Sequence, residues 1–335
     1  MAVRDSDLTI AGVLRLLGAG ASGSTLMALR EGPLRTKELT ERVPGYSPRT
    51  IYRYTAKLTE LGIIEREEQP GVPSKVVHRL SEPCGRELAE LVDAYADASL
   101  GRLPSGEIGA HEWGSFSIIG DLWESGMVEA LNLGERSLTE LSQGDHDLSF
   151  HQVSRRASLF VVGGFIEETT ERTRQRRFAL TERARRAMAL IAGVGRWRRR
   201  HVVPKGTAGL TSGEAAELIR ALLPLVTLPE HPGKSFELRV SPRGGSGAEE
   251  ERVWAEVGTG GAVLTCPGPV AEADSVASGQ VAAWVDAILD GPHADFIARG
   301  DAQLLDECLQ RLHRELWGQR PDPLEAAAIA AAPAG

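Results

Sequence analysis

Two arginine side chains, Arg49 and Arg53, stand about one helical turn apart in the segment from Ser47 to Gly62. Guanidinium groups bind phosphate oxygens and the edges of guanine bases, so this spacing suits contact with a nucleic acid. Ser47 can cap a helix that starts at Pro48, and Gly62 can end it in the left-handed conformation. The buried face of this helix should consist of Ile51, Tyr54, Leu58 and Leu61. The segment is either a DNA recognition helix or an ordinary surface helix with solvated charges.

The segment occurs twice, which favours the first interpretation. After a shift of 102 residues, which takes Gly32 to Gly134, residues 16–68 align with the second copy without a gap. Ser47 then meets Ser149, and Arg53 meets Arg155. Self-similarity over this length indicates two copies of one structural unit. We therefore expect one domain at residues 1–100 and a second at 111–203, joined by a Gly/Pro/Ser-rich linker.

The elements around the first copy predict a winged helix-turn-helix. A helix at 34–43 and a four-residue turn precede the recognition helix, which is the layout of a helix-turn-helix. After Gly62, strands at 63–65 and 75–80 flank a Gly/Pro loop and predict a hairpin, the wing. Lys75 and Arg79 of this hairpin are candidate phosphate contacts, and a helix at 82–98 closes the domain.

The predicted DNA contacts come from both copies. In the first they are Ser47, Arg49, Thr50, Tyr52, Arg53, Lys57 and Lys75. In the second they are Ser149, His151, Gln152, Arg155, Arg156, Arg172, Arg174 and Arg176, with Arg177 beside them. Gln152 and Arg155 are suited to hydrogen bonding with adenine and guanine respectively.

The second recognition helix differs from the first in its apolar second half. Leu159, Val161 and Val162 replace Lys57, Thr59 and Glu60. A helix that is apolar on nearly every side is usually buried, so we expect this half to pack on another domain or chain. An alternative is that the second copy serves only in dimerisation.

Charge is unevenly distributed along the chain. The net charge is −8, yet residues 150–205 carry 14 basic and 4 acidic side chains, whereas residues 206–335 carry 9 and 19. Phosphate contacts respond to the local field, so the overall acidity does not exclude nucleic acid.

The first copy resembles the HxlR family of bacterial winged-helix regulators, which is allied to the MarR-type regulators. The blocks GPLR, PGYSPRT and LTELGIIER, followed by the GREL segment, occur in the family's order, and the resemblance covers most of residues 8–98. It implies a DNA-binding fold that normally works as a homodimer. The family's tryptophan in the first helix is replaced here by Gly20-Ala21, whereas Trp123 restores it in the second copy.

Residues 206–318 have a different pattern, which predicts an α+β domain. Strands at 235–240, 252–257 and 261–266 are separated by glycine-rich turns, and helices are expected at 212–223, 278–289 and 301–317. The stretch from Ala273 to Leu312 resembles the sterol-carrier-protein-2 domain, whose fold encloses an apolar tunnel. If so, the candidate ligand contacts are Trp254, Val263, Trp284, Ile288, Phe296 and Leu305, although each of these is individually more typical of plain core. Residues 319–335 should form a disordered tail.

No motif recommends an enzyme. The pattern GxGxxG at 18–23 follows a helix rather than a strand, which argues against dinucleotide binding. Asp145, His146 and Asp147 lack a cysteine partner for a metal site, and three well-separated cysteines suggest a reducing cytoplasm. We expect no cofactor, no metal and no membrane span.

The fold class we expect is mainly α with α+β, namely tandem winged helix-turn-helix domains and a C-terminal α+β domain. The favoured function is a transcriptional regulator, in the family's manner a repressor, that binds double-stranded DNA and a hydrophobic small-molecule effector. A homodimer is possible. The alternatives are a hydrophobic-ligand carrier whose winged helices mediate protein contacts, and a protein that coats DNA without sequence preference.

Overall fold

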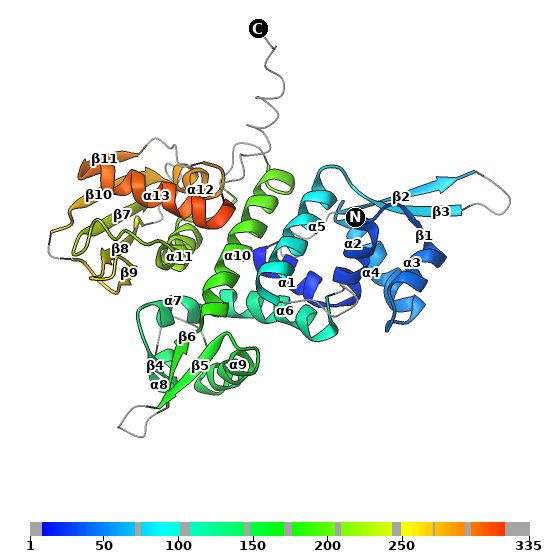
Figure 1. Ribbon diagram of the computed structural model, residues 1–335, viewed down its shortest axis with the longest axis horizontal. Coiled ribbons are helices and arrows are strands. Elements are labelled where there is room, and N and C mark those ends of the chain that lie inside the picture. The colour runs from blue at the N-terminus through cyan, green and yellow to red at the C-terminus, as the bar shows by residue number, and fades with distance from the viewer. Residues whose placement is uncertain are drawn as a thin grey trace, which may run out of the picture. The chain divides into compact units, whose positions relative to one another are not determined.

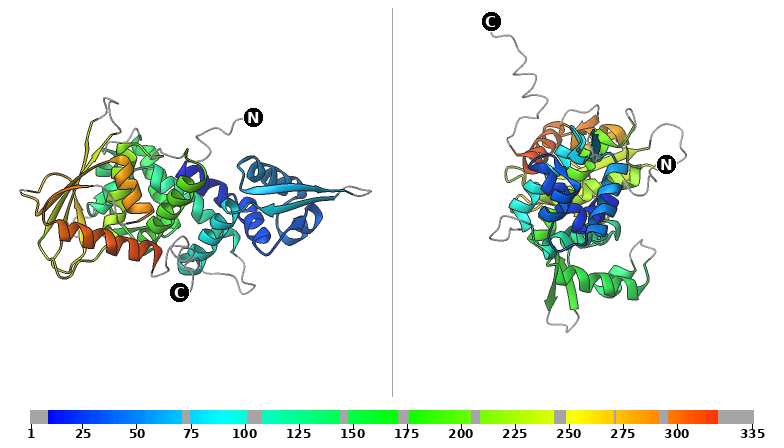
Figure 2. Two further views of the ribbon diagram at one scale, coloured as in Figure 1. Left: turned by 90° about the horizontal axis from the view of Figure 1, so that it is seen from above. Right: turned by 90° about the vertical axis from the view of Figure 1, so that its right-hand side faces the viewer.

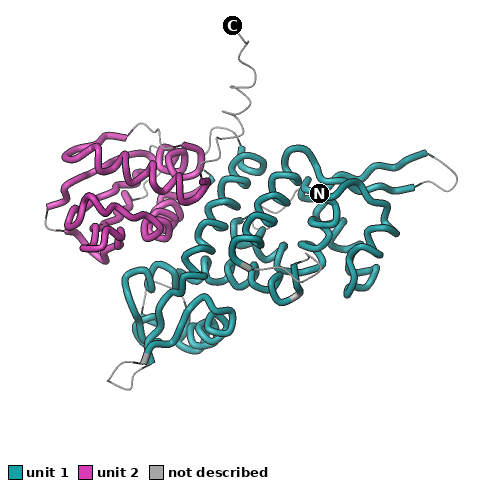
Figure 3. The backbone as a smooth tube through the Cα atoms, viewed as in Figure 1, with its two compact units in different colours: residues 1–209 teal, residues 210–335 magenta. Residues whose placement is uncertain are grey.

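The structure is a computed structural model that describes residues 9–70, 75–100, 108–143, 148–170, 176–204, 209–242, 249–270, 272–291 and 296–318. Internal contacts divide the chain into residues 1–209 and residues 210–335, coloured separately in Figure 3. We refer to them as unit 1 and unit 2 and describe each by itself. The predicted tail at 319–335 lies outside the described residues, as does most of the linker.

The first repeat of unit 1 contains five α-helices and a small sheet among its described residues (Figure 1). Its elements are α1 Ile10–Gly18, α2 Ala21–Arg30, β1 Leu34–Arg35, α3 Thr36–Arg42, α4 Pro48–Glu60, β2 Ile64–Gln69, β3 Lys75–Leu80 and α5 Cys84–Tyr95. A π-helical segment, Ala96–Leu100, follows α5. The strands pair in the order β1-β3-β2, and β2 and β3 form the antiparallel hairpin that the sequence predicts.

The second repeat follows the same order of elements. It consists of α6 Ala110–Glu124, α7 Met127–Asn132, β4 Arg136–Ser137, α8 Leu138–Ser142, α9 Phe150–Val162, β5 Ile166–Thr170, β6 Arg176–Leu180 and α10 Glu182–His201. Its sheet order, β4-β6-β5, corresponds to that of the first repeat, and Ile166 pairs with Leu180 as Ile64 pairs with Leu80. The sequence repeat is therefore also a repeat of secondary structure.

The predicted start and stop signals of α4 and α9 are present. Ser47 Oγ accepts a hydrogen bond from the backbone N–H of Thr50 at 3.2 Å, and Ser149 Oγ accepts one from Gln152 at 3.4 Å. Gly62 and Gly164, which follow the two helices, both have φ of +71°, a conformation that favours glycine.

One predicted core position of α4 is wrong. Ile51, Thr55 and Leu58 are the buried residues of this helix, whereas Tyr54 is half-buried. The buried positions recur at steps of four and three residues, and this places Tyr54 at the boundary of the apolar face. Its ring instead lies 4.8 Å from the guanidinium carbon of Arg53.

The two repeats contact each other mainly where α1 packs along α6 (Figure 2). Glycine allows the helices to approach: a Cβ atom on Gly18 would lie 2.1 Å from Ser117 Oγ, and one on Gly23 would lie 2.3 Å from the ring of Trp113. Trp113, 2% exposed, thus packs on α2 at Gly23. Gly20, the remaining glycine of the GxGxxG pattern, has a φ of +65° and lies against Tyr46, so packing and turn conformation account for the pattern.

Polar contacts join the repeats at the edges of this interface. Arg15 of α1 bonds to Asp121 of α6 at 2.7 Å and also pairs with Glu124. Where α5 meets α10, Trp197 Nε1 donates to the carbonyl oxygen of Cys84 at 2.8 Å. Apolar packing between helices and these bonds together make unit 1 a single compact body.

Unit 2 is a five-stranded sheet with helices on one face (Figure 2). Its elements are α11 Ser212–Leu222, a 3₁₀ turn Leu223–Leu225, β7 Ser235–Ser241, β8 Glu251–Val257, β9 Val263–Cys266, β10 Ser275–Gln280, α12 Val281–Leu289, β11 Ile297–Gly300 and α13 Ala302–Trp317. The strand order is β11-β10-β7-β8-β9, with β7 and β10 parallel and the other pairs antiparallel. The predicted helix at 278–289 starts later, at Val281, because β10 precedes it, and β11 was not predicted.

Among the described residues, no single helix is both long and apolar enough to cross a bilayer. The pair α1 and α2 meets the criteria of length and composition jointly, but the two helices meet at an angle of 86°.

Candidate nucleic-acid interface

The helix α4 presents a polar stripe opposite its buried face. Arg49, Arg53, Ala56 and Glu60 are all exposed, and their spacing of four, three and four residues places them along one line of the helix. Tyr52 beside this line is 56% exposed. The stripe therefore offers two guanidinium groups and an aromatic ring to a partner.

The N-terminal end of α4 is organised by its own hydroxyl groups. Ser47 Oγ and Thr50 Oγ1 lie 2.9 Å apart, within hydrogen-bond distance, and Thr50 is half-buried. Ser47 and Thr50 thus hold the first turn in place beside Arg49. The ring of Tyr54 against Arg53 supplies a cation–π contact that orients this guanidinium. Lys57, one turn further along, is half-buried.

The helix α9 presents a corresponding stripe with different chemistry. His151, Arg155, Ser158 and Val162 occupy the positions of Arg49, Arg53, Ala56 and Glu60, and all four are exposed. Arg156 is half-buried. The stripe on α9 carries one arginine where that on α4 carries two.

Gln152, which the sequence predicts to contact adenine, is bonded in the free chain to the start of its own helix. Its Oε1 accepts hydrogen bonds from the backbone N–H of Ser149 at 2.8 Å and from Ser149 Oγ at 2.9 Å, which completes a capping box. The bidentate contact with adenine needs this same oxygen. Gln152 in this conformation therefore stabilises the start of α9 instead of presenting its whole amide to a base.

The second half of α9 is exposed in the described part of the chain, and its packing on another chain stays a prediction. Leu159 is 46% exposed, Val161 37% and Val162 77%, and Phe150 at the other end is 53% exposed. The buried residues of α9 are Val153, Ala157 and Phe160, which are its contribution to the core of the repeat.

The basic residues of the hairpins divide into two groups. Lys75 at the start of β3 is exposed. Arg79 Nε donates to Glu65 Oε2 at 2.8 Å across the hairpin, so its charge is shared with an acidic neighbour. Arg176 pairs in the same way with Glu168, and this hydrogen bond lowers the pKa of the Glu168 carboxyl.

Arg177 has a structural role instead of facing outward. Its Nη2 donates to the backbone oxygen of Glu135 at 2.7 Å and lies 3.5 Å from Glu140 Oε1. Arg172 and Arg174 of the same hairpin lie outside the described residues, as do Asp145, His146 and Asp147.

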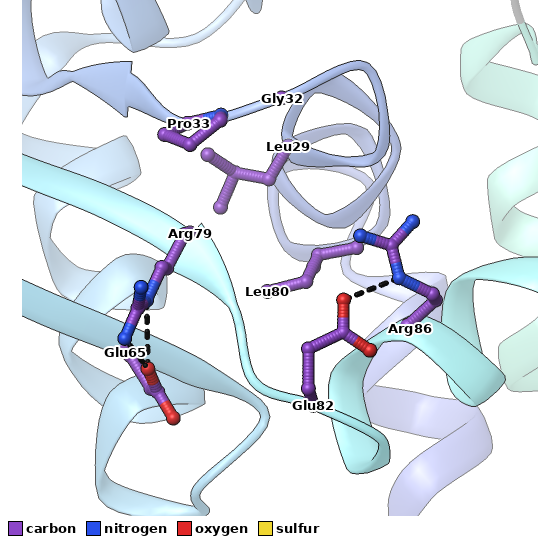
Figure 4. A pocket seen from close by; sticks show the side chains of 8 residues that line it. All are labelled: Leu29, Gly32, Pro33, Glu65, Arg79, Leu80, Glu82 and Arg86. Atoms are coloured by element: carbon purple, nitrogen blue, oxygen red, sulfur yellow. Dashed lines mark hydrogen bonds and ion pairs between the residues drawn. The ribbon is translucent and has the colours of Figure 1, made fainter.

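Arg79 belongs to a surface pocket of about 260 Å³ that sequence analysis did not find (Figure 4). The lining residues are Leu29, Gly32, Pro33, Glu65, Arg79, Leu80, Glu82 and Arg86. Two ion pairs, Arg79–Glu65 and Arg86–Glu82, stand beside the buried side chains of Leu29 and Leu80. The signal in the sequence was the spacing of four residues between Glu82 and Arg86, which is common on helix surfaces and so not diagnostic.

Three of the predicted ligand residues of unit 2 line one small void. Trp284, Ile288 and Leu305 line an apolar void of about 10 Å³, close to the space of one water molecule. Phe296 packs on the Trp284 ring at a centroid distance of 4.1 Å, and Trp254 and Val263 do not line this void. These residues pack closely around this void, and a tunnel for a hydrophobic ligand stays a prediction.

Neither a metal site nor an activated thiol is found among the described residues. They contain no group of three or more His, Cys, Asp or Glu side chains placed to hold an ion. Burial raises the pKa of the free thiols of Cys84, Cys266 and Cys308, that of Cys308 to about 12. A thiol with a raised pKa is a poor nucleophile at neutral pH.

Comparison with known proteins relates the first repeat to transcriptional regulators. Residues 17–101 match the family model described as HxlR-like helix-turn-helix. The HTH-type transcriptional regulator YodB of Bacillus subtilis is 36% identical over 67 residues, which are 20% of this chain and 60% of that protein. An uncharacterized HTH-type transcriptional regulator of Methanothermobacter thermautotrophicus is 31% identical over 81 residues, 24% of this chain and 61% of the relative. The chain thus spans about three fifths of the length of these curated relatives.

Two solved structures of YodB also match. The reduced form is 30% identical and covers 29% of this chain and 93% of its own, with a TM-score of 0.24. The diamide-treated form is 31% identical and covers 26% and 87%, with a TM-score of 0.23. By the match to the family model, residues 17–101 carry an HxlR-like helix-turn-helix domain.

Proposed function

We propose that this chain is a DNA-binding transcriptional regulator in which two winged helix-turn-helix repeats of one polypeptide take the place of the two subunits of a dimer. The observation that carries the proposal is the correspondence between α4 and α9 in the two repeats. Each is capped by a serine and exposes an arginine at the equivalent position, Arg53 or Arg155. Packing of α1 against α6 joins the repeat that contains α4 to the repeat that contains α9.

The presence of two DNA-reading repeats, here called heads, in one chain determines the form of the DNA site. Helix-turn-helix dimers bind half-sites whose centres are roughly 10 bp apart, one turn of the duplex. A symmetric dimer reads identical half-sites, whereas α4 and α9 present different side chains. The site of this chain is therefore two unequal half-sites, bound by one molecule.

The charge distribution supports the same proposal. Residues 150–205 carry 14 basic and 4 acidic side chains, and α10 ends with Arg198, Arg199, Arg200 and His201. A local excess of positive charge steers a protein to the phosphate backbone. Affinity should accordingly fall as the salt concentration rises.

Replacing Arg53 with alanine should cost about 1–3 kcal/mol of binding free energy and relax sequence preference at one position, because a base-reading guanidinium is lost. Arg155→Ala should do the same in the other half-site. Gel shifts and footprints on duplexes from the DNA upstream of the chain's own gene measure both effects. Arg299→Ala, an exposed arginine of β11 in unit 2, is the matched control and should leave affinity unchanged.

Unchanged footprints in both arginine variants would contradict the assignment of α4 and α9 as readers. A chain that binds every duplex equally would be the DNA-coating protein instead. A chain that binds no duplex at low salt would favour the carrier of hydrophobic ligands.

Repression and control by a hydrophobic effector stay predictions from the sequence. An effector at Trp284 would have to open the void beside it and separate this ring from Phe296. Footprinting with and without cell lipid extract tests this directly: effector control requires a change in protection at constant protein concentration.

A further inference from the structure

The apolar surface of α9 is unusual within the described chain. The described residues of the whole chain include seven exposed large hydrophobic side chains. Four of them lie on α9: Phe150, Leu159, Val161 and Val162. By contrast, Tyr52 is the one large hydrophobic side chain that the described helix α4 exposes. Leaving apolar surface in water forgoes about 25 cal/mol for each Å². Such a surface therefore fits a partner that covers it.

Of these four residues, Phe150 has the position in the helix best suited to contact with a base. It is the first residue of α9, directly after the cap Ser149, and the N-terminal residues of a recognition helix are those that contact base edges. The equivalent residue in α4 is Pro48, whose ring has no comparable reach. Val162, at the C-terminal end of the exposed stripe, stands where α4 has Glu60.

The charge of α9 identifies the kind of partner. The helix carries Arg155, Arg156 and His151 and has no acidic residue. Basic side chains around an apolar surface complement a polyanion that also presents apolar groups. In the major groove of DNA the one such group is the 5-methyl of thymine, and phenylalanine is among the side chains that contact it.

We infer that Phe150 contacts thymine 5-methyl groups in the half-site that faces α9, so that the second head reads thymine by apolar contact while the first head reads by hydrogen bonding through Arg49 and Arg53. The inference rests on the proposed function and adds a recognition chemistry to it. It also gives a reason for the exposed ring: Phe150 is solvated in the free chain and covered in the complex.

The test separates the methyl group from the rest of the base. The full chain is used to select binding sequences from a randomised duplex library, and Arg53→Ala identifies the half-site that faces α4. The selected duplex is then synthesised with deoxyuridine in place of thymidine in one half-site at a time. Uracil lacks the 5-methyl group and keeps the hydrogen-bonding groups of thymine.

Deoxyuridine in the α9 half-site should weaken binding about fourfold for each contacted methyl, the factor that corresponds to about 0.8 kcal/mol of buried methyl surface. The same substitution in the α4 half-site should change nothing. Phe150→Ala should bind the two duplexes equally, and Phe150→Met should keep the preference for thymine. Leu264→Ala, an exposed apolar residue of unit 2, is the control.

Because Phe150 is 53% exposed, its variants should keep the melting temperature of the parent chain. Equal affinity of the parent chain for both duplexes overturns the inference and leaves the proposed function intact. A preference for thymine that survives in Phe150→Ala overturns it as well. A third result that overturns it is a dimer of the free chain, detected by sedimentation, that the variants Phe150→Ala and Val162→Glu dissociate. The apolar surface of α9 would then bind a second copy of the chain. Failure to select any sequence removes the proposed function itself.

Discussion

Trp284→Ala is expected to lower the free energy of unfolding of unit 2 by about 3–5 kcal/mol, the range for removal of a buried aromatic side chain. Trp284 is fully buried, its Nε1 donates to the backbone oxygen of Arg239 at 2.8 Å, and its ring packs on Phe296. The variant loses this burial and leaves the carbonyl of Arg239 without its partner. A cavity remains next to the void that is now only about 10 Å³.

Hydrogen exchange followed by mass spectrometry measures the effect peptide by peptide, because the two units need separate readouts. Amides of residues 210–318 should exchange faster in the variant, whereas those of residues 9–204 should keep their protection. Leu264→Ala, at an exposed position of β9, should change protection little. A decrease in the free energy of unfolding of less than about 1 kcal/mol would contradict close packing around Trp284 and favour a tunnel in the interior of unit 2.

Gly18→Ala is expected to destabilise unit 1 by about 1–3 kcal/mol and to lower DNA affinity, because overpacking a close helix contact forces the backbones apart. The added Cβ would lie 2.1 Å from Ser117 Oγ and 2.6 Å from the backbone nitrogen of Ser117. The hydroxyl can rotate away, but the backbone nitrogen cannot. Separation of α1 from α6 changes the distance between the two reading heads, which the spacing of the half-sites fixes.

Urea unfolding and gel shifts on a selected duplex measure the two effects together. The matched control is Gly114→Ala, since this glycine of α6 has no heavy atom within 4 Å of an added Cβ. Alanine within a helix should be neutral or stabilise by about 0.5–1 kcal/mol there. If Gly18→Ala keeps both stability and affinity, contact between α1 and α6 does not set the spacing of the heads.

The secondary structure of the repeats was predictable from local signals. A serine before Pro48, a glycine at position 62 and the apolar spacing between them act within one helix, and the structure has α4 at Pro48–Glu60. The same signals locate α9, since the repeat carries them along with a shift of 102 residues. Caps and helix ends depend on neighbouring residues only, and this is why a single sequence suffices for them.

Local signals decide least where a side chain has two possible partners. Gln152 can bond to a base or to the N-terminus of its own helix, and the capping box requires no second molecule. Leu159 and Val162 can face the core or the solvent, and the three inward positions of α9 were already filled by Val153, Ala157 and Phe160. In unit 2, the sequence pattern of apolar side chains that line a tunnel is the same as that of side chains that fill a solid core.

The sequence by itself determined that the chain repeats one pattern of residues, which helix of each repeat carries the arginines, and where the acidic α+β region begins. These are properties of order and spacing along the chain. Only the tertiary structure decided that Gly18 and Gly23 join the two repeats, that Arg79 faces Glu65, and that Trp284 fills its core. Each of these depends on the distance between residues far apart in the chain, and one sequence does not specify that distance.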